Sequence, residues 1–176
     1  ANSNVRLIST DLSGGRKPVI DLDGTSVGVS FNAATGEVLY CRSGKIWSYK
    51  HDFKKHKGYH SLIIREGYIC ASPNLLSNGD IIYCSRAKIK KYDAKTKKSE
   101  IIIEDGYCVS PACHEQSNQI IYSKRANETM QIFVCNTKTQ RNEQLTFDKG
   151  DKIDPSWTPG GDWIVFCVEK AKRSYI

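Results

Sequence analysis

Short runs of apolar residues alternate with polar turns along the whole chain. Residues 154–166 (DPSWTPGGDWIVF) show the pattern well: Pro and Trp, then a Thr-Pro-Gly-Gly cluster, then an apolar run. Pro presets one backbone angle and Gly accepts conformations closed to other residues, so the cluster predicts a tight turn. Residues 163–168 are short, aromatic and β-branched, which predicts a buried strand. The stretch is therefore expected to form a β-hairpin.

Three earlier stretches repeat this hairpin pattern. They are residues 31–41 (FNAATGEVLYC), 72–84 (SPNLLSNGDIIYC) and 110–123 (SPACHEQSNQIIYS). The aromatic residues near the end of the four hairpins, Tyr40, Tyr83, Tyr122 and Phe166, are spaced by 43, 39 and 44 residues. A period of about 40–45 residues is typical of one propeller blade of four antiparallel strands.

The second half of each unit repeats as well. Residues 45–64, 88–103 and 131–146 each predict a strand, a polar turn and another strand, and residues 5–20 supply one more such half without a hairpin before it. No helical period of useful length is present. The sequence predicts an all-β chain: a β-propeller of four-stranded antiparallel blades, with four blades or as a fragment of a larger propeller.

The expected organisation is a single domain. Residues 1–27 form the second half of a blade, residues 28–69, 70–108 and 109–152 form full repeats, and residues 153–176 form the first half of a blade. The two halves are complementary. We therefore expect the strand around residues 5–10 to complete the blade begun by residues 155–168, because closure removes exposed sheet edges.

Residues 154–166 are similar to the P-S-W-S-P-D-G-x-x-I-x-F pattern of TolB-type, WD-like β-propeller repeats. Residues 131–146 resemble the strand-turn-strand of that family, which closes with Leu-Thr. Gly160 stands where the family usually carries Asp. The resemblance implies a propeller fold and a periplasmic location. Proteins named TolB carry six blades and an additional N-terminal domain.

The charge balance favours anionic partners. There are 26 basic and 19 acidic residues, a net charge of +7, and no apolar run approaches the roughly 18–20 residues of a membrane span. Nucleic acid is not the expected partner, because a surface for single strands interleaves more aromatic rings with its charges. The lysines of the turns between third and fourth strands are interpreted as protection of edge strands against aggregation. They are Lys54, Lys55, Lys57, Lys95, Lys97 and Lys98.

The seven cysteines follow the repeat. Cys41, Cys84 and Cys167 fall at equivalent positions, and so do Cys70 and Cys108. There is no Cys-x-x-Cys, so a zinc ribbon is not expected, and the cysteines are expected to be reduced and buried between blades. Reduced thiols fit a cytosolic compartment. The family resemblance implies the periplasm instead, and both locations stay open. We expect no cofactor and no metal site, since His51, His56 and His60 match no ligand spacing.

The loops on one face of the predicted propeller carry the candidate site. The turns from second to third strand contain Arg42, Arg86 and Arg125, and the connections to the next blade contain Asp23, Glu66 and Asp105, with Tyr68 and Tyr107 beside two of them. Repeat geometry predicts two concentric rings, acidic inside and basic outside. The pattern fits ordinary solvated loops, with Gly for the sharp turn into the next blade, and it also fits a polar binding face with aromatic anchors; both interpretations stay open.

The predicted function is a non-enzymatic scaffold that presents these loops to a protein or peptide partner, with an anionic ligand as a further possibility. The sequence contains no GxSxG, HExxH, GxGxxG or phosphate-loop motif. The alternative is a carbohydrate-binding or oligogalacturonate-lyase-like propeller that acts on an acidic sugar through Arg42, Arg86 and Arg125.

Overall fold

The computed structural model describes residues 5–10, 16–22, 28–32, 35–52, 57–170 and 173–175, and its regular elements are strands. β1 (Val5–Thr10) pairs with β2 (Arg16–Leu22). Blade 1 consists of β3 (Val29–Asn32), β4 (Glu37–Arg42), β5 (Lys45–Asp52) and β6 (Lys57–Ile64). Blade 2 consists of β7 (Cys70–Leu75), β8 (Ile81–Ser85), β9 (Lys88–Tyr92) and β10 (Ser99–Ile103). Blade 3 consists of β11 (Cys108–His114), β12 (Gln119–Ala126), β13 (Thr129–Asn136) and β14 (Arg141–Gln144). Blade 4 consists of β15 (Asp151–Trp157), β16 (Ile164–Lys170) and β17 (Arg173–Tyr175).

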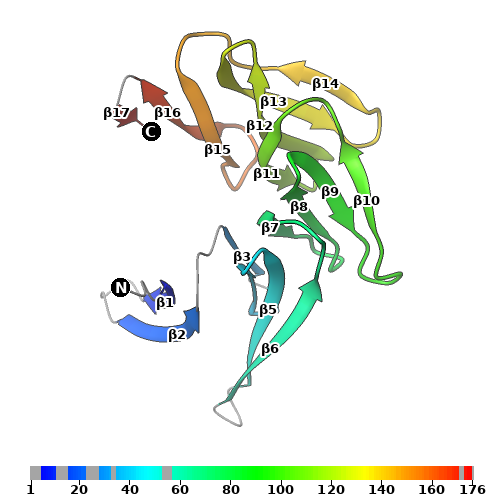
Figure 1. Cartoon of the computed structure of the whole chain (residues 1–176), viewed down its shortest axis with the longest axis vertical. Helices are drawn as coiled ribbons and strands as arrows, with labels where there is room; N and C mark the ends of the chain where they lie inside the picture. Colours follow the sequence, from blue (N-terminus) through cyan, green and yellow to red (C-terminus); the bar gives the residue numbers. More distant parts are fainter. Residues whose placement is uncertain are drawn as a thin grey trace.

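The blades follow one another around an arc (Figure 1). Within each blade the strands pair antiparallel in chain order, and the first strand of one blade packs beside the first strand of the next: β3 on β7, β7 on β11 and β11 on β15. This arrangement makes the first strands the inner strands and the fourth strands the outer ones. The predicted all-β fold of four-stranded antiparallel blades is confirmed, in the form of part of a propeller. None of the described segments forms an apolar helix of membrane-spanning length.

The expected closure between the two ends of the chain is wrong for the described strands. β1 was expected to pair beside β16, but it pairs only with β2 in a separate two-stranded sheet. The edge of β16 is taken instead by β17, through the pairs Val168↔Tyr175 and Lys170↔Arg173. The short segment that follows β16 therefore begins the third strand of its own blade, at the position that β1 was expected to fill.

The inner strands carry the same backbone irregularity at the same place. Ser72, Ser110 and Asp154, each followed by Pro, have φ of 49°, 49° and 50°, and the strand register shifts beside each of them. Gly28, before β3, has φ of 93°. A Cβ at Gly28 would lie 2.9 Å from the Cα of Ser72, so only glycine allows the two inner strands to approach this closely.

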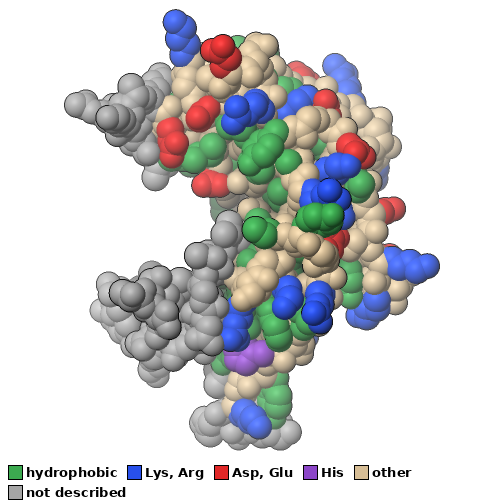
Figure 2. All heavy atoms as spheres, viewed as in Figure 1, with side chains coloured by type: hydrophobic (Ala, Val, Ile, Leu, Met, Phe, Trp, Pro, Cys, Tyr) green, Lys and Arg blue, Asp and Glu red, His purple; other side chains and the backbone are tan. Residues whose placement is uncertain are grey.

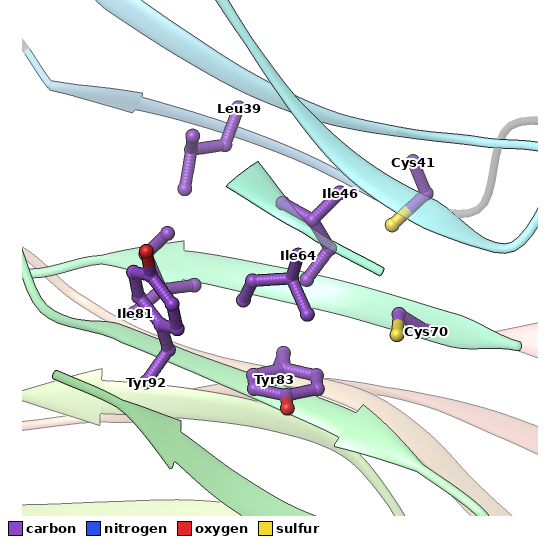
Figure 3. Close-up of a cluster of buried hydrophobic side chains, with 8 residues drawn as sticks. All are labelled: Leu39, Cys41, Ile46, Ile64, Cys70, Ile81, Tyr83 and Tyr92. Atoms are coloured by element: carbon purple, nitrogen blue, oxygen red, sulfur yellow. The ribbon is translucent and has the colours of Figure 1, made fainter. Parts of the chain in front are cut away.

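The core lies between successive blades. The cluster between blades 1 and 2, shown in Figure 3, contains Leu39, Cys41, Ile46, Ile64, Cys70, Ile81, Tyr83 and Tyr92. A second cluster lies between blades 2 and 3 and contains Ile82, Ile89, Ile103, Cys108, Ile120, Tyr122, Phe133 and Cys135. Each four-stranded blade therefore packs one face against the blade before it and the other against the blade after it. This packing explains why the apolar positions repeat along the sequence.

The aromatic residues that revealed the repeat are fully buried tyrosines in three blades. Burial of a phenol requires a partner for its hydroxyl. The Tyr40 hydroxyl lies 2.9 Å from His60 Nδ1, and the Tyr83 hydroxyl donates to Glu66 Oε1 over 2.5 Å. The repeat conserves the ring position, whereas the partner differs between these two blades.

All seven cysteines are free, and five of them are buried. Burial raises the pKa of the Cys41 thiol to about 12 and that of Cys84 to about 11, from an ordinary value of 9.0. The folded chain therefore keeps these thiols protonated above pH 9, where an unfolded chain ionises them.

The stability contributed by these two thiols should be constant below about pH 9 and should decrease as pH rises toward 11–12. Each thiol should account for about 1 kcal/mol of lost unfolding free energy per pH unit in that window. Urea unfolding at several pH values between 8 and 11 measures this slope. The Cys41→Ala/Cys84→Ala variant should show a shallower slope than the wild type, and equal slopes would contradict the assignment.

Candidate binding face

Two kinds of connecting segment meet on one face of the arc, which we call the connection face. It consists of the turns between second and third strands with the strand ends beside them (residues 42–44, 86–87 and 125–128) and the connections from an outer strand to the next inner strand (residues 65–69, 104–107 and 145–150). The Cys70 amide donates to the Gly44 carbonyl, and the Cys108 amide donates to the Ala87 carbonyl, both over 2.9 Å. Each of these turns is therefore fixed against the start of the next blade.

The structure brings four of the predicted site residues together as two aromatic–arginine pairs. The Arg86 guanidinium carbon lies 3.7 Å from the centre of the Tyr68 ring, and that of Arg125 lies 5.7 Å from the centre of the Tyr107 ring. Both distances are within the range of cation–π attraction. Tyr68 and Tyr107 are 52% and 51% exposed. Adjacent blades thus present the same accessible pair at equivalent positions.

The same connections expose further apolar side chains. Ile69 and Phe147 are 72% and 77% exposed. Figure 2 shows Lys and Arg side chains beside hydrophobic ones over the middle of the arc. Exposed apolar groups close to basic ones are typical of interaction surfaces rather than of ordinary solvated loops.

The two predicted acidic residues that the structure describes, Glu66 and Asp105, are paired with lysines. Glu66 accepts hydrogen bonds from the Tyr83 hydroxyl and, over 3.0 Å at each carboxylate oxygen, from Lys90 Nζ. Burial pushes the pKa of Glu66 up, but the hydrogen bonds from Tyr83 and Lys90 outweigh it, so the net pKa is lowered. Asp105 forms an ion pair with Lys124. Sequence reasoning missed Lys90, because its position in the middle of β9 gives no signal of this contact.

These pairings leave the two arginines of the aromatic–arginine pairs available for a ligand. Within the described part of the chain, neither Arg86 nor Arg125 is paired with a carboxylate. Arg42 differs from them. It ends β4, and its charge and hydrogen bond oppose the burial that raises the pKa of Tyr40. The last of the eight predicted site residues, Asp23, lies outside the described residues.

Lys152 is a buried lysine that stabilises the connection from blade 3 to blade 4, and it was not identified from the sequence. Lys152 is 1% exposed, and its Nζ donates to the carbonyl oxygens of Asp148, Lys149 and Gly150 while pairing with the Asp148 carboxylate at 2.9 Å. Three hydrogen bonds and one ion pair satisfy its ammonium fully. Lys152 therefore acts as an internal cation that holds residues 148–150 in place.

The repeat gives the signal that would have identified Lys152. Cys70 and Cys108 stand three residues before the Pro of their inner strands, and Lys152 stands three residues before Pro155. Both thiols also donate to a carbonyl of the preceding connection, namely those of Tyr68 and Asp105. Lys152 likewise donates to carbonyls of the preceding connection, and its ammonium is a stronger donor than a thiol.

The inner strands of the four blades line an open pocket of about 230 Å³. Its polar groups bond to one another: Ser110 Oγ donates to Asp154 Oδ1 over 2.7 Å, and Asn74 Nδ2 donates to the Pro111 carbonyl over 2.8 Å. These bonds tie neighbouring inner strands together. Among the described residues, no group of three or more His, Cys, Asp and Glu side chains is arranged to hold a metal ion.

No family model and no curated protein matches the sequence. Solved structures do match the fold. TolB from Acinetobacter baumannii superposes with a TM-score of 0.76 at 17% identity, over 97% of this chain and 47% of that one. The putative TolB from Agrobacterium tumefaciens gives 0.78 at 11% identity, over 91% and 60%. The chain thus spans about half to three fifths of the length of these TolB structures.

Two further matches come from proteins with different roles. One is the structure of a nidogen/laminin complex, with a TM-score of 0.71 at 13% identity over 90% of this chain and 63% of that one. The other is oligogalacturonate lyase in complex with manganese, with 0.64 at 14% identity over 96% and 52%. At such identities the similarity shows the β-propeller fold alone.

Proposed function

We propose that this chain is a non-enzymatic binding propeller whose connection face takes an acidic segment of a protein or peptide partner. The observation that carries this proposal is the repeated aromatic–arginine pair, Arg86 over Tyr68 and Arg125 over Tyr107, in neighbouring blades. An isolated pair of this kind is a common surface contact. Its repetition at equivalent positions provides two similar contacts one blade apart for one extended partner.

The chemistry of the pairs favours carboxylate groups. A guanidinium presents a planar fork of N–H donors that matches a carboxylate, and stacking on a ring holds that fork in place before binding. The half-exposed Tyr68 and Tyr107 rings add apolar contact area, as binding hot spots commonly do. The net charge of +7 attracts an acidic partner from a distance.

The structural neighbours do not distinguish a binding role from a catalytic role for this chain. They include the nidogen/laminin complex, and they also include a gluconolactonase from Xanthomonas campestris and the manganese-bound oligogalacturonate lyase. Fold alone does not determine function. The non-enzymatic role therefore rests on the chemistry of the connection face, and the acidic sugar remains the competing ligand because the same arginines would bind it.

The double variant Arg86→Ala/Arg125→Ala should bind peptides selected on the wild-type chain at least about tenfold more weakly, because it removes both guanidinium groups. The peptides come from a displayed random library, and fluorescence anisotropy measures their dissociation constants. We expect them to be rich in Asp and Glu. The matched control is Lys95→Ala/Lys98→Ala, which removes two positive charges from the exposed turn between β9 and β10.

Equal weakening by the two double variants would mean that binding follows net charge and would contradict a role of the connection face. Polygalacturonate provides the competing ligand in the same assay. Binding of polygalacturonate that is lost in Arg86→Ala/Arg125→Ala, with no selected acidic peptide, would favour the sugar alternative. Release of unsaturated sugar products by the wild-type chain would contradict the non-enzymatic role.

A further inference from the structure

A cavity of about 380 Å³ opens between blades 2 and 3 at the opposite ends of the strands from the connection face. Its opening is formed by the hairpin turns that follow β7, β11 and β13. Its apolar floor consists of Ile82, Ile102, Ile103, Cys113, Ile120 and Cys135. A volume in this range, with an apolar floor and a polar rim, is typical of sites for small organic ligands.

The cavity exists because blade 3 carries two cysteines where blade 2 carries large side chains. In blade 2, Ile81 pairs with Leu75 on one side and with Tyr92 on the other. In blade 3 the equivalent residue, Ile120, pairs with Cys113 and Cys135.

The two interfaces between blades differ accordingly. Tyr92 is only 7% exposed and fills the space between blades 1 and 2, together with Leu75, which packs against the same cluster (Figure 3). The equivalent space between blades 2 and 3 is lined by the smaller side chains of Cys113 and Cys135 and is open. The cavity is therefore a specific feature of one interface and not a general property of the repeat.

The rim of the cavity is acidic although the chain as a whole is basic. Its one lysine, Lys91, is already paired at 3.0 Å with the buried Asp80. Glu115 accepts hydrogen bonds from the amide and hydroxyl of Ser77, which keep its carboxylate at the rim. Glu100 is exposed and faces Lys91 across the strand pair. The two glutamates outnumber the available positive charge, so the rim attracts a cation.

We propose that this cavity binds a small amine with an apolar body: the alkyl or aryl part lies on the isoleucines and cysteines, and the ammonium group lies at Glu100 and Glu115. The site is separate from the connection face. Its failure in a test would leave the proposed partner-binding role unaffected, and the reverse also holds.

Three probes of equal chain length test the charge preference: n-hexylamine (an ammonium at pH 7), n-hexanol and hexanoate. Isothermal titration calorimetry and ¹H–¹⁵N spectra of the wild-type chain give affinity and location. Hexylammonium should bind most tightly, with shifts at residues 100–103, 113–120 and 135. Glu100→Gln should weaken hexylammonium about threefold and leave hexanol unchanged, as expected for one exposed charge pair. Hexanoate binding as tightly as hexylammonium, or no binding of any probe, would overturn the proposal.

A variant that restores the residues of blade 2 tests the origin of the cavity. Cys113→Leu/Cys135→Tyr should fold, unfold at a higher temperature than the wild type and no longer bind hexylammonium, since the new side chains occupy the site. The matched control enlarges a cysteine where the interface is filled: Cys41→Leu, in the cluster that Tyr92 fills between blades 1 and 2, should lower the unfolding temperature. Retained binding by the filled variant would contradict the site, and a lower unfolding temperature for it would contradict the empty space.

Discussion

Replacing Lys152 with Ala should lower the free energy of unfolding by about 2–4 kcal/mol, a large loss for a single residue of this chain. The ammonium satisfies three backbone carbonyls and pairs with Asp148, all within one connection. Removing it leaves the carbonyls of Lys149 and Gly150 without this donor, whereas the Asp148 carbonyl keeps its hydrogen bond from Gln131 Nε2. It also empties the space of a side chain that is 1% exposed, and both losses are costly. Urea unfolding monitored by tryptophan fluorescence measures the loss.

Two further variants separate this explanation from a general loss of charge. Lys149→Ala removes an exposed lysine of the same connection and should change stability by less than about 0.5 kcal/mol. Lys152→Cys should retain part of the stability lost in Lys152→Ala, because Cys70 and Cys108 show that a thiol can donate to a carbonyl from this position. A Lys152→Ala loss below about 1 kcal/mol would contradict the role of the internal cation.

Replacing Gly161 with Ala should cost about 2–4 kcal/mol. Its φ of 75° is unfavourable for any residue with a Cβ, which accounts for about 1–2 kcal/mol. The added Cβ would also lie 2.4 Å from the ring of His114, which is held by a hydrogen bond to Ser117 and by contact with the Trp157 ring. Overpacking of this kind adds about 1–3 kcal/mol. Thermal unfolding gives the comparison with the wild type.

Gly36 provides the matched control, because it has φ of 66° and no atom within 4 Å of an added Cβ. Gly36→Ala should therefore show only the backbone cost. In the double variant Gly161→Ala/His114→Ala, the steric part should disappear, so the two substitutions should be non-additive. Equal costs for the two glycine variants, or strict additivity with His114→Ala, would contradict the steric explanation.

The repeat made most of the fold predictable from the sequence. The turn chemistry of residues 158–161 and the tyrosines at one period predicted antiparallel hairpins in successive blades, because strand alternation and turn residues act locally. Closure was not predictable in the same way. β1 and β17 lie at opposite ends of the chain, and either could pair with the free edge of β16. The local sequence pattern of each segment does not show which of the two pairs there.

The candidate site was predicted by position but not by pairing. Loop equivalence placed Tyr68, Arg86, Tyr107 and Arg125 on one face, and the structure pairs them. The expected acidic ring did not anticipate that Lys90 reaches Glu66, since a long flexible side chain selects its partner only in the folded chain. The cavity at Cys113 and Cys135 could not be predicted from the sequence either, because a small side chain leaves a space only when the opposing blade does not fill it.

Titration of the ¹⁵N-labelled chain with a selected acidic peptide, followed by ¹H–¹⁵N spectra, tests the binding role of the connection face most directly. We expect the largest shifts at residues 65–69, 86–87, 104–107 and 125, with the rest of blades 2 and 3 nearly unchanged. The same titration of Arg86→Ala/Arg125→Ala should leave these signals in place. Shifts concentrated at the turn of residues 93–98, or spread evenly over the lysines of the chain, would contradict the connection face as the binding surface.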